Sequence, residues 1–516
     1  MSRPFRVTAL CLCAVLCVSL CGCFAGTATG DNPAATEATA TATETTATTT
    51  TVKTTTTAPQ KKDDAPPALC YDKSDSLSPY AAKTRVNRAL APLLYEGLTA
   101  ANADYSASPC LAESIKKVDA THYTVTLKKN VKFSDNSSLK AADVAASFRL
   151  AARSEAYADL VADVASVTAK DDRTLTVTFT SAVPYVETAL SFPVVKTVKN
   201  GAVGTGAYRV NAKKTALEKN PKARVSATIP TFTLTNVSRK EEMQFALETG
   251  TVSLYTDDLT DGTVPRTVTD VTLTPTTLPY LVYLGFNANR KPWSSASMRA
   301  SVGDAISRTD VTAVGFSGFA VPTATPFCPD SAVAREVSGA NLSKNVAAAV
   351  ATWKKHGYNV TENGTVKHRL SAELLCVKTN AMHKAAANEI AKEAKSAGMQ
   401  VTVKALSESE YTARLASGNY DLYLGEVRLP NTLSLDAVLT DAGGASYGVS
   451  VGGIGLWAQY KSGKLTAQKF TDAFFKEMPF LPLCYAQGLT LSSKRLSGIA
   501  PSGVTAFDGV EQWNYT

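Results

Sequence analysis

The stretch that decides the fold is residues 110–149, CLAESIKKVDATHYTVTLKKNVKFSDNSSLKAADVAASFR. In its middle, apolar residues alternate with polar ones at Tyr123, Val125 and Leu127. A period of two predicts a strand with one buried face. The helical pattern that follows places one apolar stripe at Val144, Phe148 and Ala151. A strand followed by a helix predicts a mixed α/β chain.

The same units recur along the sequence. RTLTVTF at 173–179 repeats the strand pattern, and ASMRASVGDAISRTDV at 296–311 predicts a second helix. AMHKAAANEIAKEAKSAG at 381–398 predicts a third helix, which Asn380 can cap and Gly398 can end. MQVTVKAL follows directly as a strand. Helix, short glycine turn and strand together form an α/β unit.

The N-terminus predicts export. Arg3 and Arg6 precede a short apolar run, the pattern of a signal peptide over residues 1–22. The run ends in Leu20-Cys21-Gly22-Cys23, which resembles the bacterial lipobox. That resemblance implies that Cys23 carries a diacylglyceryl group, because Cys21 as the acceptor would put bulky Leu20 directly before it. An ordinary secreted protein cleaved nearby is the alternative. We therefore expect the protein at the outer face of a cell membrane, in a Gram-positive envelope.

A polar tether follows. Residues 23–67 are rich in Thr and Ala and contain few large apolar side chains, so they are predicted to stay disordered. As a flexible coil this segment would reach roughly 35–40 Å. About 450 residues remain, which predicts two or three lobes.

Charge excludes one class of function. The net charge of +8 includes Arg3 and Arg6, and no acid precedes Cys23, so the mature balance is +8 − 2 = +6. This is mild for the length, and no basic run interleaved with aromatics suggests nucleic-acid binding. Beyond the leader, no apolar stretch is long enough to cross a membrane, so contact with the membrane is expected through the lipid only.

Catalytic and metal-binding patterns are weak. The body has five widely spaced cysteines, so at least one is free if the others pair: Cys70, Cys110, Cys328, Cys376 and Cys484. GASYG at 444–448 matches G-x-S-x-G, but glycine-rich flanks do not fit a hydrolase elbow. The histidines show no H-x-x-x-H pair. We expect no enzyme activity, metal or cofactor, and we predict a mobile loop for the glycine-rich segment at 441–455.

Ordered motifs over nearly the whole body resemble one family, the extracytoplasmic solute-binding proteins of peptide and nickel ABC importers. The signature at 110–149 is joined by six further segments: DSLSPYAAKTRVNRALAPLLYEGLT, GTGAYRV, FALETGTVSLY, LGFNANRKPWSSASMRASVGDAISRTDV, SGNYDLYLGEVRLP and EMPFLPLCYAQG. Ala207 replaces the usual proline of GTGPY, and Ser253 replaces an aspartate.

The resemblance implies a two-lobed, periplasmic-binding-protein-like α/β fold of class II, with a hinged cleft between the lobes and a subdomain inserted in the first lobe. The implied boundaries are 68–93, 203–261 and 485–516 for the first lobe, 94–202 for the subdomain and 262–484 for the second lobe. A hinged cleft binds by closing around its ligand.

Candidate ligand contacts follow from the same resemblance. Relatives usually place an aspartate after the Tyr-Asp-Leu strand, but here Arg428 or Leu429 stands near that place. Arg428 is predicted to meet an anionic ligand group or Glu426 across the cleft mouth, and the alternative is a salt bridge at the surface or within one lobe. The other predicted contacts lie in the opening segment, the second lobe and the return strand: Ser76, Leu77, Ser78, Tyr95, Asn287, Gly425, Glu426, Val427, Trp457 and Tyr485.

The predicted function is capture of a peptide or related small solute and its delivery to ABC permease and ATPase subunits, by a protein acting as a monomer. The alternative is a surface lipoprotein of the same fold that acts in signalling or adhesion.

Overall fold

The computed structural model describes residues 65–516, apart from 200, 267–268 and 363–364. The predicted signal peptide at 1–22, the lipidation of Cys23 and the tether up to residue 64 lie outside the described residues.

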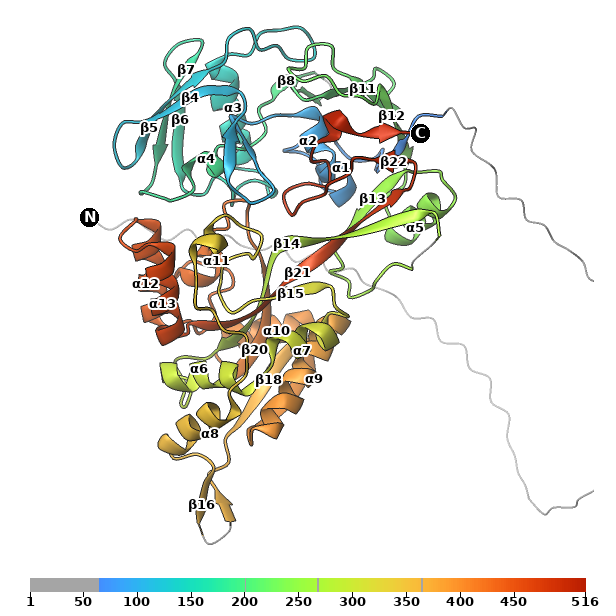
Figure 1. Cartoon of the computed structure of the whole chain (residues 1–516). Helices are drawn as coiled ribbons and strands as arrows, with labels where there is room; N and C mark the ends of the chain where they lie inside the picture. Colours follow the sequence, from blue (N-terminus) through green and yellow to red (C-terminus); the bar gives the residue numbers. More distant parts are fainter. Residues whose placement is uncertain (1–64, 200, 267–268, 363–364) are drawn as a thin grey trace, which may run out of the picture. The chain divides into compact units, whose positions relative to one another are not determined.

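Within the described part of the chain, the largest sheet has eleven strands (Figure 1). One end of this sheet forms the core of what we call the first lobe. Its strands lie in the order β10-β11-β12-β1-β13. Their bounds are β1 (Ala68–Tyr71), β10 (Tyr208–Val210), β11 (Ala216–Lys219), β12 (Thr231–Asn236) and β13 (Leu254–Asp257).

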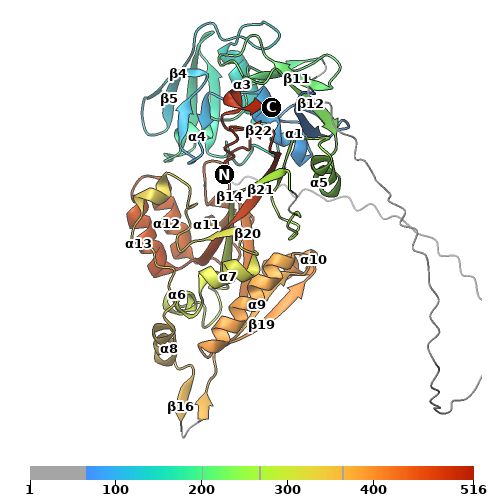
Figure 2. The same cartoon turned by 45° about the vertical axis from the view of Figure 1, so that its right-hand side comes forward.

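Two long antiparallel strands, β14 (Val271–Phe286) and β21 (Phe480–Ser493), connect the ends of this sheet. They run side by side through the middle of the molecule in Figures 1 and 2. The register between them shifts after Thr277 and again after Val282. β21 pairs with β13 on one side of this irregularity, and β14 pairs with β20 on the other. These two strands are therefore positioned to act as the hinge.

The other end of the sheet forms what we call the second lobe. The added strands lie in the order β20-β18-β19, with β15 on β21. Its strands and main helices are β15 (Ala320–Pro322), β18 (Ser371–Val377), β19 (Gln400–Leu406), β20 (Leu422–Arg428), α6 (Ala296–Ala305), α7 (Arg308–Gly315), α8 (Val346–Lys355), α9 (Ala381–Ser396), α10 (Glu408–Ala416), α11 (Asp436–Leu439), α12 (Val451–Lys461) and α13 (Ala467–Glu477).

A separate four-stranded sheet, in the order β4-β5-β7-β6, carries helix α3 and has a hydrophobic core of its own. We call this unit the subdomain. Its elements are β4 (Ala112–Lys117), β5 (His122–Leu127), α3 (Ala141–Ala151), β6 (Val164–Ala169), β7 (Thr174–Phe179) and α4 (Val186–Ala189).

The remaining elements are short connections. They are α1 (Arg85–Ala89), α2 (Ala91–Leu94), α5 (Lys240–Glu248), β2 (Thr99–Ala101), β3 (Ala107–Pro109), β8 (Lys196–Val198), β9 (Gly201–Val203), β16 (Val360–Glu362), β17 (Thr365–Lys367), β22 (Leu496–Ser497), β23 (Asn514–Tyr515) and the 3-10 helices η1 (Val333–Glu336) and η2 (Val510–Gln512).

Most local predictions are confirmed, but the single helix expected at 296–311 is two helices, α6 and α7, because the backbone is extended at Ile306 and Ser307 caps α7. Tyr123, Val125 and Leu127 are buried along β5. The Asn380 side chain accepts a hydrogen bond from the His383 backbone at the start of α9, and β19 pairs in parallel with β18. The lobe boundaries at individual residues stay a prediction.

The prediction of a loop over 441–455 is wrong in part. Part of the glycine-rich segment forms helix α12 instead of a loop, because Ser450 caps the helix by accepting a hydrogen bond from the Gly453 backbone. A Cβ atom at Gly453 would lie 2.4 Å from the Pro479 side chain. Gly453 lowers the helix propensity of this segment, but the close packing against Pro479 leaves no room for a larger side chain.

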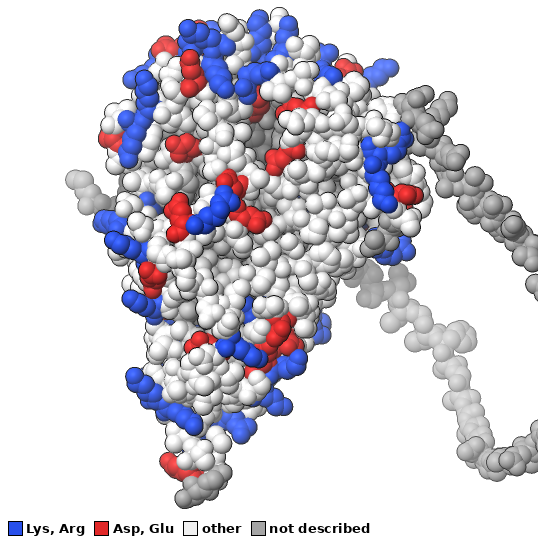
Figure 3. Space-filling view, viewed as in Figure 1, with Lys and Arg blue, Asp and Glu red and all other residues white. Residues whose placement is uncertain are grey.

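The five cysteines of the described residues are all buried and unpaired. None of the described helices combines the length and the apolarity needed to span a lipid bilayer. On the face shown in Figure 3, basic and acidic side chains are interspersed, and basic ones gather at the upper edge.

Candidate functional site

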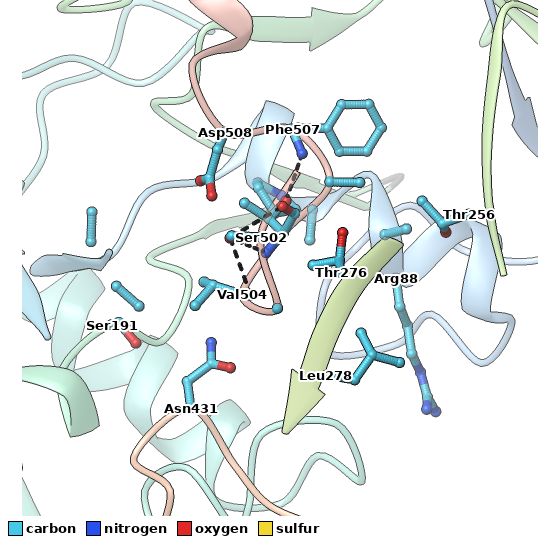
Figure 4. A pocket seen from close by; sticks show the side chains of 18 of the residues that line it. Arg88, Ser191, Thr256, Thr276, Leu278, Asn431, Ser502, Val504, Phe507 and Asp508 are labelled. Atoms are coloured by element: carbon cyan, nitrogen blue, oxygen red, sulfur yellow. Dashed lines mark hydrogen bonds between the residues drawn. The ribbon is translucent and has the colours of Figure 1, made fainter. Parts of the chain in front are cut away.

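A cavity of about 520 Å³ lies where the two lobes and the subdomain meet. Its walls come from α1 and α2, the middle of β14 and β21, and the C-terminal loop 502–511. From the second lobe, Asn431 in the loop after β20 also lines this cavity. Figure 4 shows the side chains of Asn431 and Asp508 pointing toward the same space from opposite sides. Its size suits a small organic ligand.

An ion triad borders this cavity and joins the lobes. Asp258, which follows β13, has an Oδ1 atom 2.5 Å from Arg85 Nη1 and an Oδ2 atom 3.2 Å from Arg428 Nη2. Arg428 also lies over the Tyr280 ring, with its Cζ atom 4.5 Å from the ring centroid. Burial alone would raise the pKa of Asp258, but Arg85, Thr260 and Arg428 hold it below its ordinary value. Asp258 is therefore a charged link across the cleft.

Three residues that line the same cavity carry buried polar atoms without a hydrogen-bond partner in the described part of the chain. Glu96 Oε2, Thr276 Oγ1 and Asp508 Oδ2 are buried and have no hydrogen-bond partner among the described residues, and all three residues line the cavity. Burial raises the pKa of Asp508 above its ordinary value. Buried acceptors without partners are costly, so these atoms are suited to a ligand that donates hydrogen bonds.

Of the residues predicted to bind ligand, Tyr95 lines the cavity, and Arg428 touches its wall through Asp258 and Tyr280. Ser76, Leu77 and Ser78 lie in the loop after β1; the Leu77 carbonyl accepts a hydrogen bond from the Tyr95 hydroxyl.

The other predicted contacts have protein partners. Asn287 donates to the Gly418 and Tyr420 carbonyls, and Tyr485 donates to the Pro326 carbonyl. Glu426 lies 3.0 Å from His383 Nε2, while Val427 is buried and Gly425 pairs with Tyr283. Trp457 is buried and donates to Asp436. The role of these residues in ligand binding stays a prediction.

Sequence reasoning missed most of the cavity wall. Arg85 lies inside the opening motif, and Asn431 directly follows the segment SGNYDLYLGEVRLP, so their positions in the sequence could have pointed to both. The C-terminal loop with Asp508 carries no motif. Among the described residues, no three His, Cys, Asp or Glu side chains gather in a way that could hold a metal ion.

Replacing Asp258 with Asn should lower the free energy of unfolding by about 1–2 kcal/mol, because both arginines are largely exposed and solvent screens the lost pairs. Since the pKa of Asp258 is lowered on folding, its stabilisation is present above the ordinary value of 3.8 and is lost as pH falls through the lower folded value. Urea unfolding at pH 7 and at pH 3 and below measures this. If the wild type exceeded the variant in free energy of unfolding by the same amount at every pH in this range, the prediction would be contradicted.

Comparisons with known proteins place this architecture. A family model described as "Bacterial extracellular solute-binding proteins, family 5 Middle" matches residues 106–440. Glutathione-binding protein GsiB of Salmonella choleraesuis is 25% identical over 280 residues, which cover 50% of this chain and 54% of that protein. The GsiB of Escherichia coli K12 is 25% identical over 282 residues, with the same coverage. The chain thus spans about half the length of the curated relatives it matches.

Solved structures match over most of the chain. The substrate-binding protein CtaP of Listeria monocytogenes aligns with a TM-score of 0.68 at 18% identity, covering 88% of this chain and all of CtaP. NikA of Brucella suis, solved with Fe(III)-EDTA, aligns with a TM-score of 0.64 at 17% identity, covering 87% of this chain and all of NikA. At these identities the likeness concerns the fold, and the predicted two-lobed α/β fold is confirmed.

Proposed function

Because the chain belongs to the bacterial extracellular solute-binding proteins, family 5, we propose that it captures a small solute between its lobes and delivers it to an ABC importer. The observation that carries this proposal is the cavity of about 520 Å³, bordered by both lobes beside the two strands that connect them. Closure of the lobes would bury the solute and exclude water. No bond is made or broken in this function.

A peptide or a related solute with both charged and hydrogen-bonding groups fits the lining. Asp508 and Glu96 supply free carboxylate oxygens that can accept from an amine or amide. Arg85, at the same cavity, supplies a guanidinium group. The relatives named above support this class through the names they carry, glutathione-binding protein among them. We propose that Cys23 carries the lipid that holds the receptor at the outer membrane face.

The central experiment is native mass spectrometry of the purified protein, which retains and identifies a copurified solute. Isothermal titration with that solute, glutathione and short peptides then gives affinities. We expect a bound mass to appear on the folded protein and to disappear on denaturation. Absence of any bound mass, together with no heat from the peptide panel, would count against capture of this solute class.

Replacing Asn431 with Trp should fill the space where this side chain enters the cavity (Figure 4). We expect occupancy by the copurified solute to fall at least about tenfold, since the bulky ring would exclude the ligand or leave its polar groups unpaired. The matched control is Asn341→Trp, at an exposed position of the second lobe. Unchanged occupancy in the Asn431 variant, at unchanged melting temperature, would place the solute elsewhere.

A further inference from the structure

A shielded ionic network joins the subdomain to the second lobe away from the cavity described above. Lys461, at the end of α12, has its Nζ atom 2.8 Å from Asp163 Oδ1 of the subdomain. The same Nζ atom lies 2.8 Å from Asp436 Oδ2 at the start of α11. The side chains of Lys461 and Asp163 are 14% and 13% exposed, so this contact is far less screened than the surface ion pairs.

Each half of the network is held by its own part of the molecule. In the second lobe, Trp457 Nε1 donates to Asp436 Oδ1 over 2.6 Å, and this fixes the carboxylate that holds Lys461. In the subdomain, the Tyr185 hydroxyl donates to Asp163 Oδ2 over 2.8 Å. Both halves can therefore persist when the lobes part, while the contact between Lys461 and Asp163 must break.

The network also reaches the ligand cavity. Asp436 directly follows the loop 429–435, which carries Asn431 into the cavity wall. The Tyr185 hydroxyl contacts Ser434 Oγ of this loop at 3.3 Å. Tyr185 and Trp457 also both line a second cavity between the subdomain and the second lobe. Figures 1 and 2 show α12 and α11 lying against the subdomain side of the second lobe.

We propose that Lys461 is a positioning residue for solute binding: its ammonium group bridges Asp163 and Asp436, locks the subdomain onto the second lobe and fixes the loop that carries Asn431. Burial alone would lower the pKa of Lys461, but the hydrogen bonds to Asp163 and Asp436 raise it, so the ammonium stays charged. A hydrogen bond between two charged groups is strong enough to shift the balance of closed and open forms about tenfold.

The test is hydrogen–deuterium exchange of the ligand-free full chain carrying Lys461→Met. We expect about tenfold faster exchange in the backbone amides of the subdomain segment 184–189 and of the loop 429–436, because both are released when the contact breaks. The matched control is Lys464→Met, at an exposed lysine three residues away. Faster exchange confined to α12 itself would mean a merely local structural role and would overturn the proposal.

A second variant, Asp163→Asn, breaks the same contact from the subdomain side. The double variant with Lys461→Met should exchange no faster than the faster single variant, because one contact cannot be lost twice. Effects that multiply would overturn the proposal. If Lys461→Met fails to fold, Asp163→Asn alone tests the proposal. Its amide exchange in the same two segments is then compared with that of the control Asp159→Asn, at an exposed position. No ligand is required, so failure here is distinct from failure of the proposed function.

Discussion

Replacing Gly204 with Ala is expected to destabilise the first lobe by about 3 kcal/mol or more. A Cβ atom at this position would lie 2.1 Å from the Leu94 carbonyl oxygen and 2.5 Å from the Tyr95 ring. The first of these atoms belongs to the backbone, so it cannot rotate away. Gly206 makes a similar approach, and its backbone nitrogen donates to the Leu94 carbonyl.

The measurement is urea unfolding followed by circular dichroism, with Gly455→Ala as the matched control. Gly455 lies in α12 with nothing within 4 Å of an added Cβ, so alanine there should stabilise the helix by up to about 1 kcal/mol. Because Tyr95 lines the ligand cavity, solute occupancy should also fall in the Gly204 variant. A Gly204 variant as stable as the control would show that the loop shifts freely.

These glycines explain a motif that sequence reasoning found without its cause. GTGAYRV resembles a family turn, and the structure shows why two glycines stand there: the loop lies directly against the backbone at Leu94. Such a contact joins segments about 110 residues apart, and no local periodicity encodes it. Local patterns predicted β5, α3 and α9 correctly because each element buries one face of its own sequence.

The cavity was harder to predict for the same reason. Its walls come from segments that the hinge strands and the C-terminal return bring together, from Arg85 to Glu511. The resemblance suggested Trp457 and Tyr485 as ligand contacts, and in the fold both side chains donate hydrogen bonds inside the protein. Arg428 forms an ion pair with Asp258 across the lobes, whereas the salt bridge expected for it was one at the surface or within a lobe. Its contact with an anionic ligand group stays a prediction.

The second large effect is expected from a change at Cys23, the proposed site of lipid attachment. If Cys23 carries the proposed lipid, replacing Cys23 with Ser should abolish partition of the protein into the detergent phase of Triton X-114, because the lipid would be attached through the cysteine sulfur. The reason is the sequence Leu20-Cys21-Gly22-Cys23, in which small residues directly precede Cys23. Each buried methylene contributes about 0.8 kcal/mol, so loss of the acyl chains removes the anchor entirely.

The matched control is Cys21→Ser, two residues earlier, which should leave partition and the intact lipidated mass unchanged. If only the Cys21 variant lost detergent-phase partition, Cys21 would be the residue that accepts the lipid. If both variants and the wild type stayed in the aqueous phase, the protein would be secreted without lipid. The proposed anchor matters for the proposed function because it would hold the receptor at high effective concentration near an importer. A Cys23→Ser protein that still binds its solute in solution, but no longer supports its uptake by cells, would separate capture from delivery.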